Sequence, residues 1–330
     1  MKIRWVDRVA FWGINHLLSS PVHQKFDVAE FTEFVGAWRG RHIREFYQVD
    51  RAKRGTGEAV RRLEKRAPPM HEVMEFPTPE PCAWKRNNHI WIHLHIAHPL
   101  DTAPMFFIGH GWRSVSVGGY HATCRRLNDL GVNAGILHLP YHFSRRPTGS
   151  FNGELAITSN VVRSAHAFRQ AVQELCWLKE VFKELGVPHV GLWGPSYCAW
   201  ISGLAMVVDE GFGGAVLLEP PVEVEELFWE VPLFSNLQKE LNRRQITREN
   251  LHDLFTLVTP HHHPLKTDPS RVLILGAEHD PIGYPESLRR MHRAWPGTHL
   301  DILPIGHISH HLHEAALDRF TSLLLPKLRP

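Results

Sequence analysis

The sequence contains no run of about 18 uncharged apolar residues, which is the length that a membrane-spanning helix requires. Residues 1–20 place charges among the apolar positions, so no unbroken apolar segment typical of a secretory signal occurs there. Only four cysteines are present and none forms a CxxC pair, which argues against a cysteine zinc site and a disulfide framework. We therefore expect a cytoplasmic protein with reduced thiols and no transmembrane segment.

A large excess of charge of one sign is also missing. The 37 Lys and Arg residues are nearly balanced by 34 Asp and Glu residues, which leaves a net charge of +3. This excess is too small to predict a nucleic-acid partner. The segment Arg41–Arg66 is locally basic, and either a solvated helix face or peripheral contact with an anionic membrane surface explains it. The oligomeric state stays open.

The chain has 330 residues, of which 43% are hydrophobic, enough for one large domain. Residues 1–70 show helical periodicity with basic linkers. Their aromatic and aliphatic residues fall on two helical faces, one with Trp5, Val9, Trp12 and Leu17 and one with Phe31, Phe34, Trp38, Ile43 and Phe46. We predict an N-terminal helical extension over residues 1–70 and one domain over residues 71–330.

From residue 71 the periodicity changes to that of strands, with extended segments predicted at His71–Phe76, Cys82–Arg86 and Ile90–Ile96. Strands and helices then alternate. Strands are predicted at Met105–Ile108, Val132–His138, His189–Trp193, Ala215–Glu219, Val272–Leu275 and His299–Leu303, and helices at Tyr120–Leu130, Asn160–Leu185, Ser196–Val208, Pro285–Trp295 and Leu312–Leu325. This order predicts an α/β fold with a mostly parallel central sheet flanked by helices. Residues 221–266 interrupt the alternation, and we interpret them as a helical cap insert over the carboxyl edge of the sheet.

The segment GLWGPSYC, residues 191–198, turns an apolar strand directly into a helix. Such a turn exposes a serine hydroxyl above the sheet and requires small residues two positions before and after the serine. Gly194 meets the first requirement, while Cys198 stands where a second glycine is usual. Ser196 is therefore a candidate nucleophile. The alternative is a helix N-cap, whose hydroxyl accepts from free backbone N–H groups.

A serine hydroxyl needs an oriented base to attack at neutral pH, so the hypothesis requires a histidine and an acid further along the chain. Asp280 follows one predicted strand, and His307 follows the next one, just after Gly306. The order Ser, Asp, His is the one that this architecture uses. Alternatives for the acid are Glu219 and Glu278, and alternatives for the base are His310, His311 and His313.

Three motifs resemble those of the α/β-hydrolase superfamily: the turn IGHGW at residues 108–112, the segment Gly194–Cys198, and Asp280 with Gly306 and His307. The resemblance covers roughly residues 90–328. It implies that Ser196 is the nucleophile, His307 the general base and Asp280 the residue that orients the imidazole. It also implies that the backbone N–H groups of Trp112 and Tyr197 form an oxyanion hole.

The segment HLPYH at residues 138–142, followed by RRP at 145–147, is similar to a little-characterised α/β-hydrolase-domain branch shared by bacteria and eukaryotes. The long N-terminal extension fits the same branch. That branch implies no settled substrate.

The expected function is a serine hydrolase that cleaves a carboxylic ester or thioester, with a small-molecule or lipid-like substrate and no cofactor. Gly111, Trp200, Phe228 and Trp229 are predicted to contact the substrate, although ordinary core or lid packing explains the aromatic residues equally well. No metal is expected, because the histidine run 261–263 lacks an HExxH pattern. The alternative is a catalytically weak hydrolase-like binding or scaffold protein, in which Cys198 inactivates the strand-to-helix turn at residues 194–198, called the elbow below.

Overall fold

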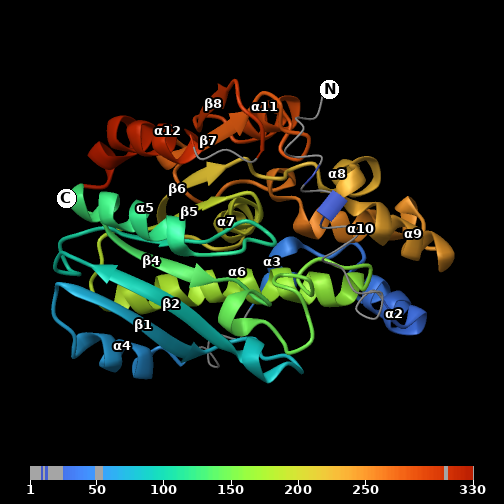
Figure 1. Ribbon diagram of the computed structural model, residues 1–330, viewed down its shortest axis with the longest axis horizontal. Helices are drawn as coiled ribbons and strands as arrows, with labels where there is room; N and C mark the ends of the chain where they lie inside the picture. The colour runs from blue at the N-terminus through green and yellow to red at the C-terminus, as the bar shows by residue number, and fades with distance from the viewer. Residues whose placement is uncertain (1–8, 10–11, 14–24, 49–54, 308–310, 330) are drawn as a thin grey trace.

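The computed structural model describes residues 9, 12–13, 25–48, 55–307 and 311–329 (Figure 1). Its central feature is an eight-stranded sheet in the order β1-β2-β4-β3-β5-β6-β7-β8. The strands are β1 (Met70–Pro77), β2 (His89–Ile96), β3 (Met105–Ile108), β4 (Asn133–His138), β5 (Val190–Pro195), β6 (Phe212–Leu218), β7 (Val272–Ala277) and β8 (His299–Leu303). The pairs β1–β2 and β2–β4 are antiparallel and all others are parallel, which confirms the predicted fold class.

The inner strands form because they are short apolar runs that can be buried on both faces. Every residue of β3, β4, β6 and β7 is buried, as expected for parallel strands covered by helices on each side. Strand β1, at the edge of the sheet, alternates buried and exposed residues along part of its length. Its less buried positions include the polar residues His71 and Glu75.

Helices cover both faces of the sheet. Helices α5 (Gly118–Asp129) and α12 (His311–Arg319) pack on one face, where they share a hydrophobic cluster with β3 and β4. Helices α6 (Val161–Glu184), α7 (Tyr197–Val208) and α11 (Pro285–Ala294) share a larger cluster on the other face. Among the helices of the described residues, none combines the length and hydropathy needed to cross a membrane.

Helices α2 (Val28–Trp38), α3 (Ile43–Tyr47) and α4 (Gly57–Glu64) precede the sheet. All three contact α6, and buried Phe46 and Tyr47 belong to the same cluster as that helix. Val9 and Trp12 are exposed by 49% and 56%, whereas Trp5 and Leu17 lie outside the described residues. The boundary at residue 70 stays a prediction.

Residues 221–266 form α8 (Val224–Glu230), α9 (Ser235–Arg243) and α10 (Arg248–Val258). The 3-10 turn Pro232–Phe234 joins α8 to α9, and a second one, Pro260–His262, follows α10. Helix α10 begins at a capping box in which the Thr247 side chain and the Asn250 side chain each bind the other residue's backbone. It also contacts α2 and α3, so these two helices and the insert lie side by side (Figure 1).

Two local predictions were wrong. Cys82–Arg86 is not extended, and a 3-10 helix occupies Lys85–Asn88. The reason is local: the Asn88 side chain accepts from the Cys82 N–H at 2.7 Å and donates to its carbonyl at 2.8 Å, which closes a turn. The last helix is α-helical only to Arg319, then continues as a π-helix over Phe320–Leu324 and a 3-10 turn over Leu325–Lys327.

Candidate active site

Ser196 lies between β5 and α7 in a strained backbone conformation, with φ 48° and ψ −112°. A positive φ is unfavourable for a residue with a Cβ, and such strain persists only where the surroundings enforce it. Here the Ser196 N–H donates to the Leu218 carbonyl of the neighbouring strand at 2.7 Å. The sharp turn raises the serine above the carboxyl edge of the sheet, as the strand-to-helix motif predicts.

Cys198 packs into this turn. Its thiol is buried and lies 3.6 Å from the Trp193 carbonyl. A Cβ on Gly194 would lie 2.3 Å from the sulfur, so the strand and the helix pass one another only because residue 194 is glycine. Burial raises the pKa of the Cys198 thiol to about 12, which keeps it neutral at physiological pH. The sulfur fills space in the elbow and is not itself an activated nucleophile.

Ser196, His307 and Asp280 form a continuous row of hydrogen bonds. The Ser196 Oγ lies 3.0 Å from His307 Nε2, and His307 Nδ1 lies 2.8 Å from Asp280 Oδ2. Asp280 is fully buried, and its other oxygen accepts from the Ile282 N–H at 2.7 Å. With the carboxylate fixed in this way, Nδ1–H donates to Asp280 and Nε2 is left to accept from the serine hydroxyl.

A second carboxylate approaches the same imidazole. Glu219, which directly follows β6 and has φ 50°, places Oε2 3.7 Å from His307 Nδ1. Glu278, the other alternative for the acid, is exposed. Asp280 is thus the acid within hydrogen-bond distance, and Glu219 is a buried neighbour. Of the alternative histidines, His310 lies outside the described residues, while His313 lines the cavity above the serine.

The turn after β3 carries Trp112, one of the two residues predicted to bind an oxyanion. Gly111 lies against the nucleophile, because a Cβ added to it would be 3.9 Å from the Ser196 Cβ. The Trp112 indole N–H donates to the Gly153 carbonyl at 2.7 Å, and its ring stacks on Phe234. Tyr197 is the first residue of α7, where a backbone N–H has no acceptor within the helix.

His110 connects this turn to the segment that follows β4. Its Nε2 accepts from the Leu139 N–H at 3.1 Å, so Nδ1 carries the proton and donates to the Gly111 carbonyl at 3.0 Å. Burial and the neighbouring His142 hold the pKa of His110 well below its usual value. The imidazole therefore stays neutral and acts as a fixed link between two loops.

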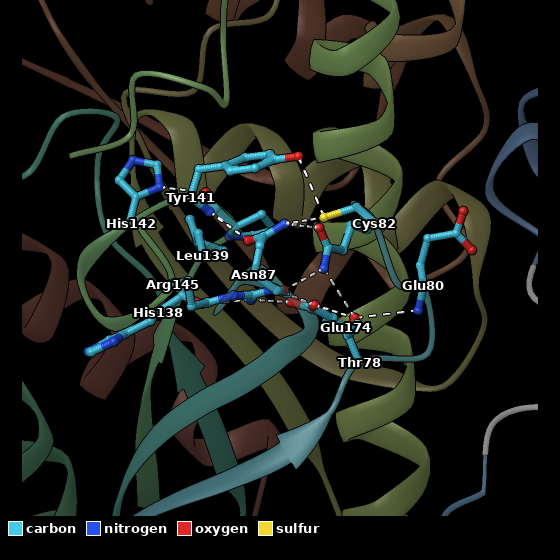
Figure 2. Close-up of polar contacts among 12 residues, drawn as sticks. Thr78, Glu80, Cys82, Asn87, His138, Leu139, Tyr141, His142, Arg145 and Glu174 are labelled. Atoms are coloured by element: carbon cyan, nitrogen blue, oxygen red, sulfur yellow. Dashed lines mark hydrogen bonds and ion pairs between the residues drawn. The ribbon is translucent and has the colours of Figure 1, made fainter. Parts of the chain in front are cut away.

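The loop after β4 is held by a buried ion pair, drawn in Figure 2. Arg145 donates to both carboxylate oxygens of Glu174 at 2.6 and 2.7 Å, and it also donates to the carbonyls of His138 and Asn87. Both charged side chains are fully buried. The same loop places His142 in a stacked contact with the Tyr197 ring, with centroids 5.8 Å apart. The network therefore holds in place the loop that packs against Tyr197, the residue after Ser196.

A cavity of about 700 Å³ opens above Ser196. It brings together most of the sequence-predicted residues: Gly111, Trp112, Ser196, Tyr197, Trp200 and His307. Phe228 and Trp229 lie outside its lining, and the cap contributes Leu227, Leu233 and Phe234 instead. Phe228 stacks on Phe234 at 5.7 Å and lines a smaller cavity beside Trp200, so it lies one layer behind the wall.

Sequence reasoning missed Arg113, a lining residue that follows the predicted oxyanion turn. It is only 7% exposed, and burial lowers the pKa of its guanidinium to about 10, which leaves it charged at neutral pH. The guanidinium lies 5.1 Å from the Trp112 ring centroid. The sequence signal that could have identified Arg113 is its position directly after the IGHGW turn. Otherwise the cavity wall is largely aromatic and aliphatic, with Ile282, Leu312 and Tyr120 among the further residues not predicted.

Donor atoms of Glu219, Asp280 and His307 lie close enough together to ligate a metal ion. The two short hydrogen bonds of His307, however, use both of its ring nitrogens for Ser196 and Asp280. The donor set thus fits an acid–base pair better than a metal centre.

Comparison with known proteins gives a match only at the level of structure. No protein-family model and no curated protein matches the chain. Among solved structures, a hyperthermophilic esterase from the archaeon Pyrobaculum calidifontis is 16% identical, with a TM-score of 0.52 over 99% of this chain and 100% of that one. The esterase Est2 from Thermogutta terrifontis, in its native form, is 16% identical, with a TM-score of 0.54 over 78% and 92% of the two chains.

A putative hydrolase from Agrobacterium vitis S4 gives a TM-score of 0.55 at 14% identity, covering 77% of this chain and 99% of that one. At identities this low, structural similarity establishes the fold only. The chemistry has to be inferred from the residues of the site. The chain therefore has the α/β-hydrolase fold, which confirms the fold that the motifs imply.

Proposed function

We propose that the protein is a serine hydrolase that cleaves a carboxylic ester or thioester through an acyl-enzyme on Ser196. The observation that carries the proposal is the hydrogen-bonded row from Ser196 through His307 to Asp280. Ser196 and His307 line the cavity. Each residue has the partner that its role requires, and no further group is needed to activate the serine.

In the acylation step, His307 Nε2 takes the hydroxyl proton as Ser196 Oγ attacks the carbonyl carbon. Asp280 stabilises the imidazolium that forms, and the developing oxyanion accepts from the backbone N–H groups of Trp112 and Tyr197. The tetrahedral intermediate collapses when His307 returns the proton to the leaving alcohol or thiol. Water then attacks the acyl-enzyme with His307 as base, and the carboxylic acid leaves as Ser196 regains its proton.

The cavity wall supports an ester with an apolar acyl or aryl portion. Trp112, Trp200 and Leu233 present apolar surface above Ser196, which favours such a group over a strongly polar one. The fold neighbours named as esterases include Est2 with propionate bound, at a TM-score of 0.53 and 16% identity. A carboxylate product of that kind is what cleavage of an ester releases.

The test is intact-mass labelling with a fluorophosphonate probe, which reacts only with an activated serine. Wild-type protein should gain one adduct per chain, and Ser196→Ala should gain none. Ser202→Ala is the matched control, because Ser202 is a buried serine on the same helix, 3.8 Å from the Cys198 sulfur. It should label like the wild type.

Labelling that persists in Ser196→Ala would overturn the assignment of the nucleophile. Absence of an adduct on wild-type protein with a cooperative melting transition would overturn the hydrolase proposal and favour the binding or scaffold alternative. A chain-length series of p-nitrophenyl esters and thioesters, assayed with the same three proteins, then defines the acyl group.

A further inference from the structure

A group of histidines lies on the outer part of the sheet, away from Ser196. Strands β1 and β2 pair antiparallel, and their register places His71 directly opposite His95. The two rings lie with centroids 4.1 Å apart. Helix α5 crosses this face and brings His121, whose Nδ1 lies 2.8 Å from His95 Nε2. One ring nitrogen from each of the three histidines lies within 4.8 Å of the other two.

We propose that His71, His95 and His121 bind a divalent transition-metal ion of the imidazole-preferring class, with Zn²⁺ as the reference ion and water as the fourth ligand. Three histidines with one open position form an established zinc ligand set. Zinc–nitrogen bonds of 2.0–2.1 Å in a tetrahedral site separate the nitrogens by about 3.4 Å. The donor atoms lie within 4.8 Å of one another, with His95 Nε2 and His121 Nδ1 2.8 Å apart, so their observed separations lie on the scale that the ion requires.

The burial of the three histidines suits a metal site, because His95 is buried, His121 is partly buried and His71 is exposed. Because His71 is exposed, an ion from solvent can reach the group without a rearrangement of the fold.

Two further histidines adjoin the proposed ligands. The His93 ring lies 5.3 Å from the His121 ring, and its Nε2 lies 3.0 Å from His138 Nε2. This pair separates the proposed site from the loop after β4. None of the five histidines lines the cavity above Ser196. A bound ion would therefore clamp β1, β2 and α5 together and would take no part in ester cleavage.

Another histidine group in the described residues is less suitable. Glu223, His261 and His262 also bring three donor atoms together. There, however, the Glu223 carboxylate already accepts from Arg290 at 2.6 Å and lies 3.3 Å from His261. In the proposed site the ring nitrogens face one another, and the contact between His95 and His121 uses one shared proton that a metal ion can replace.

The experiment is isothermal titration calorimetry of ZnCl₂ into the full-length protein, purified without a polyhistidine tag and stripped with a chelator. We expect one ion per chain with a micromolar or tighter dissociation constant. His71→Ala and His121→Ala should each weaken binding at least about tenfold. His262→Ala, in the other histidine group, is the matched control and should leave the affinity unchanged. Co²⁺ in place of Zn²⁺ should give the intense visible absorption of a tetrahedral site.

His71 is exposed, so its loss should leave the fold intact, and a melting curve for each variant checks this. Absence of binding, or binding that is unchanged in the His71→Ala/His121→Ala double variant, would overturn the proposal. The same titration on Ser196→Ala should match the wild type, because the inference does not rest on the hydrolase chemistry.

Discussion

The sulfur of Cys198 occupies the space next to Gly109: a Cβ added to Gly109 would lie 2.2 Å from it. Gly194 makes an equally close approach from β5, at 2.3 Å. The ends of β3 and β5 and the start of α7 therefore meet on one sulfur atom. Cys198 is accommodated because both of its neighbours are glycines, so its presence does not by itself distort the elbow.

Gly109→Ala should sharply reduce ester hydrolysis and lower the free energy of unfolding by about 1–3 kcal/mol, because the new methyl group overlaps a buried side chain. An ester-hydrolysis assay and urea denaturation measure the two effects. Removing the sulfur in Gly109→Ala/Cys198→Gly should recover part of the activity. Gly119→Ala is the control, since a Cβ there meets nothing within 4 Å. Wild-type activity and stability in Gly109→Ala would contradict the packing argument.

Asp280→Asn should lower kcat, because an amide favours the wrong tautomer of His307. A loss of about 10⁴-fold is known for such a change in a serine protease. Here we expect about 10²- to 10³-fold, since Glu219 lies 3.7 Å from the same ring nitrogen and supplies a second negative charge.

The double variant Asp280→Asn/Glu219→Gln tests this compensation. Its kcat should fall well below that of Asp280→Asn, while Glu219→Gln alone should cost less than about tenfold. Steady-state kinetics on one ester with all four proteins gives the comparison. If the double variant is no slower than Asp280→Asn, Glu219 contributes nothing to orienting the imidazole.

Acid should destabilise the protein through His142. Burial lowers the pKa of this histidine to about 3, and its Nδ1–H donates to the Pro140 carbonyl at 2.8 Å. Between that pKa and the ordinary value near 6.5, the unfolded chain binds a proton that the folded chain does not. The free energy of unfolding therefore falls as the pH decreases through this window, by at most about 1.4 kcal/mol per pH unit for one histidine.

His142→Phe keeps an aromatic ring and removes the titration. Loss of the bond to Pro140 should lower stability at every pH, so the slope against pH is the informative quantity. Urea denaturation from pH 7.5 to pH 5 should show that the free energy of unfolding depends less steeply on pH in the variant. The difference in slope should correspond to at most about one bound proton, or about 1.4 kcal/mol per pH unit. Parallel slopes for the two proteins would show that His142 does not account for the acid sensitivity.

The sheet and the row of Ser196, Asp280 and His307 follow from local patterns in the sequence. Short apolar runs define the buried strands, and the chain order of the three polar residues matches one architecture. The bounds of β3 and β8 agree with the prediction to the residue. Such agreement is expected where burial on both faces leaves few alternatives to a strand.

The cavity wall was less predictable, because it depends on which face a short helix presents. Along α8, Leu227 and Phe228 are consecutive and both apolar, so periodicity does not show that Leu227 faces the cavity. The proposed metal site was equally hard to predict from the sequence. Alternation in β2 places His93 and His95 on one face, but the register with β1 and the crossing of α5 bring in His71 and His121.

The Arg145–Glu174 pair joins residues far apart in the chain, and it gives a last prediction about stability. Both side chains are fully buried. Arg145→Met leaves a buried carboxylate without its cation and should cost about 3–5 kcal/mol. Arg146→Met is the matched control, because Arg146 is the next residue and is exposed; it should change stability by less than about 0.5 kcal/mol.

Arg145→Met/Glu174→Leu should be more stable than the sum of the two single variants implies, since an apolar pair of similar volume avoids the unpaired charge. A double-mutant cycle by urea denaturation measures this coupling. Because the same loop stacks His142 on Tyr197, Arg145→Met should also slow ester hydrolysis under conditions where it stays folded. Additive losses of stability would mean that the two charges act independently, and full activity in folded Arg145→Met would mean that the loop does not support the elbow.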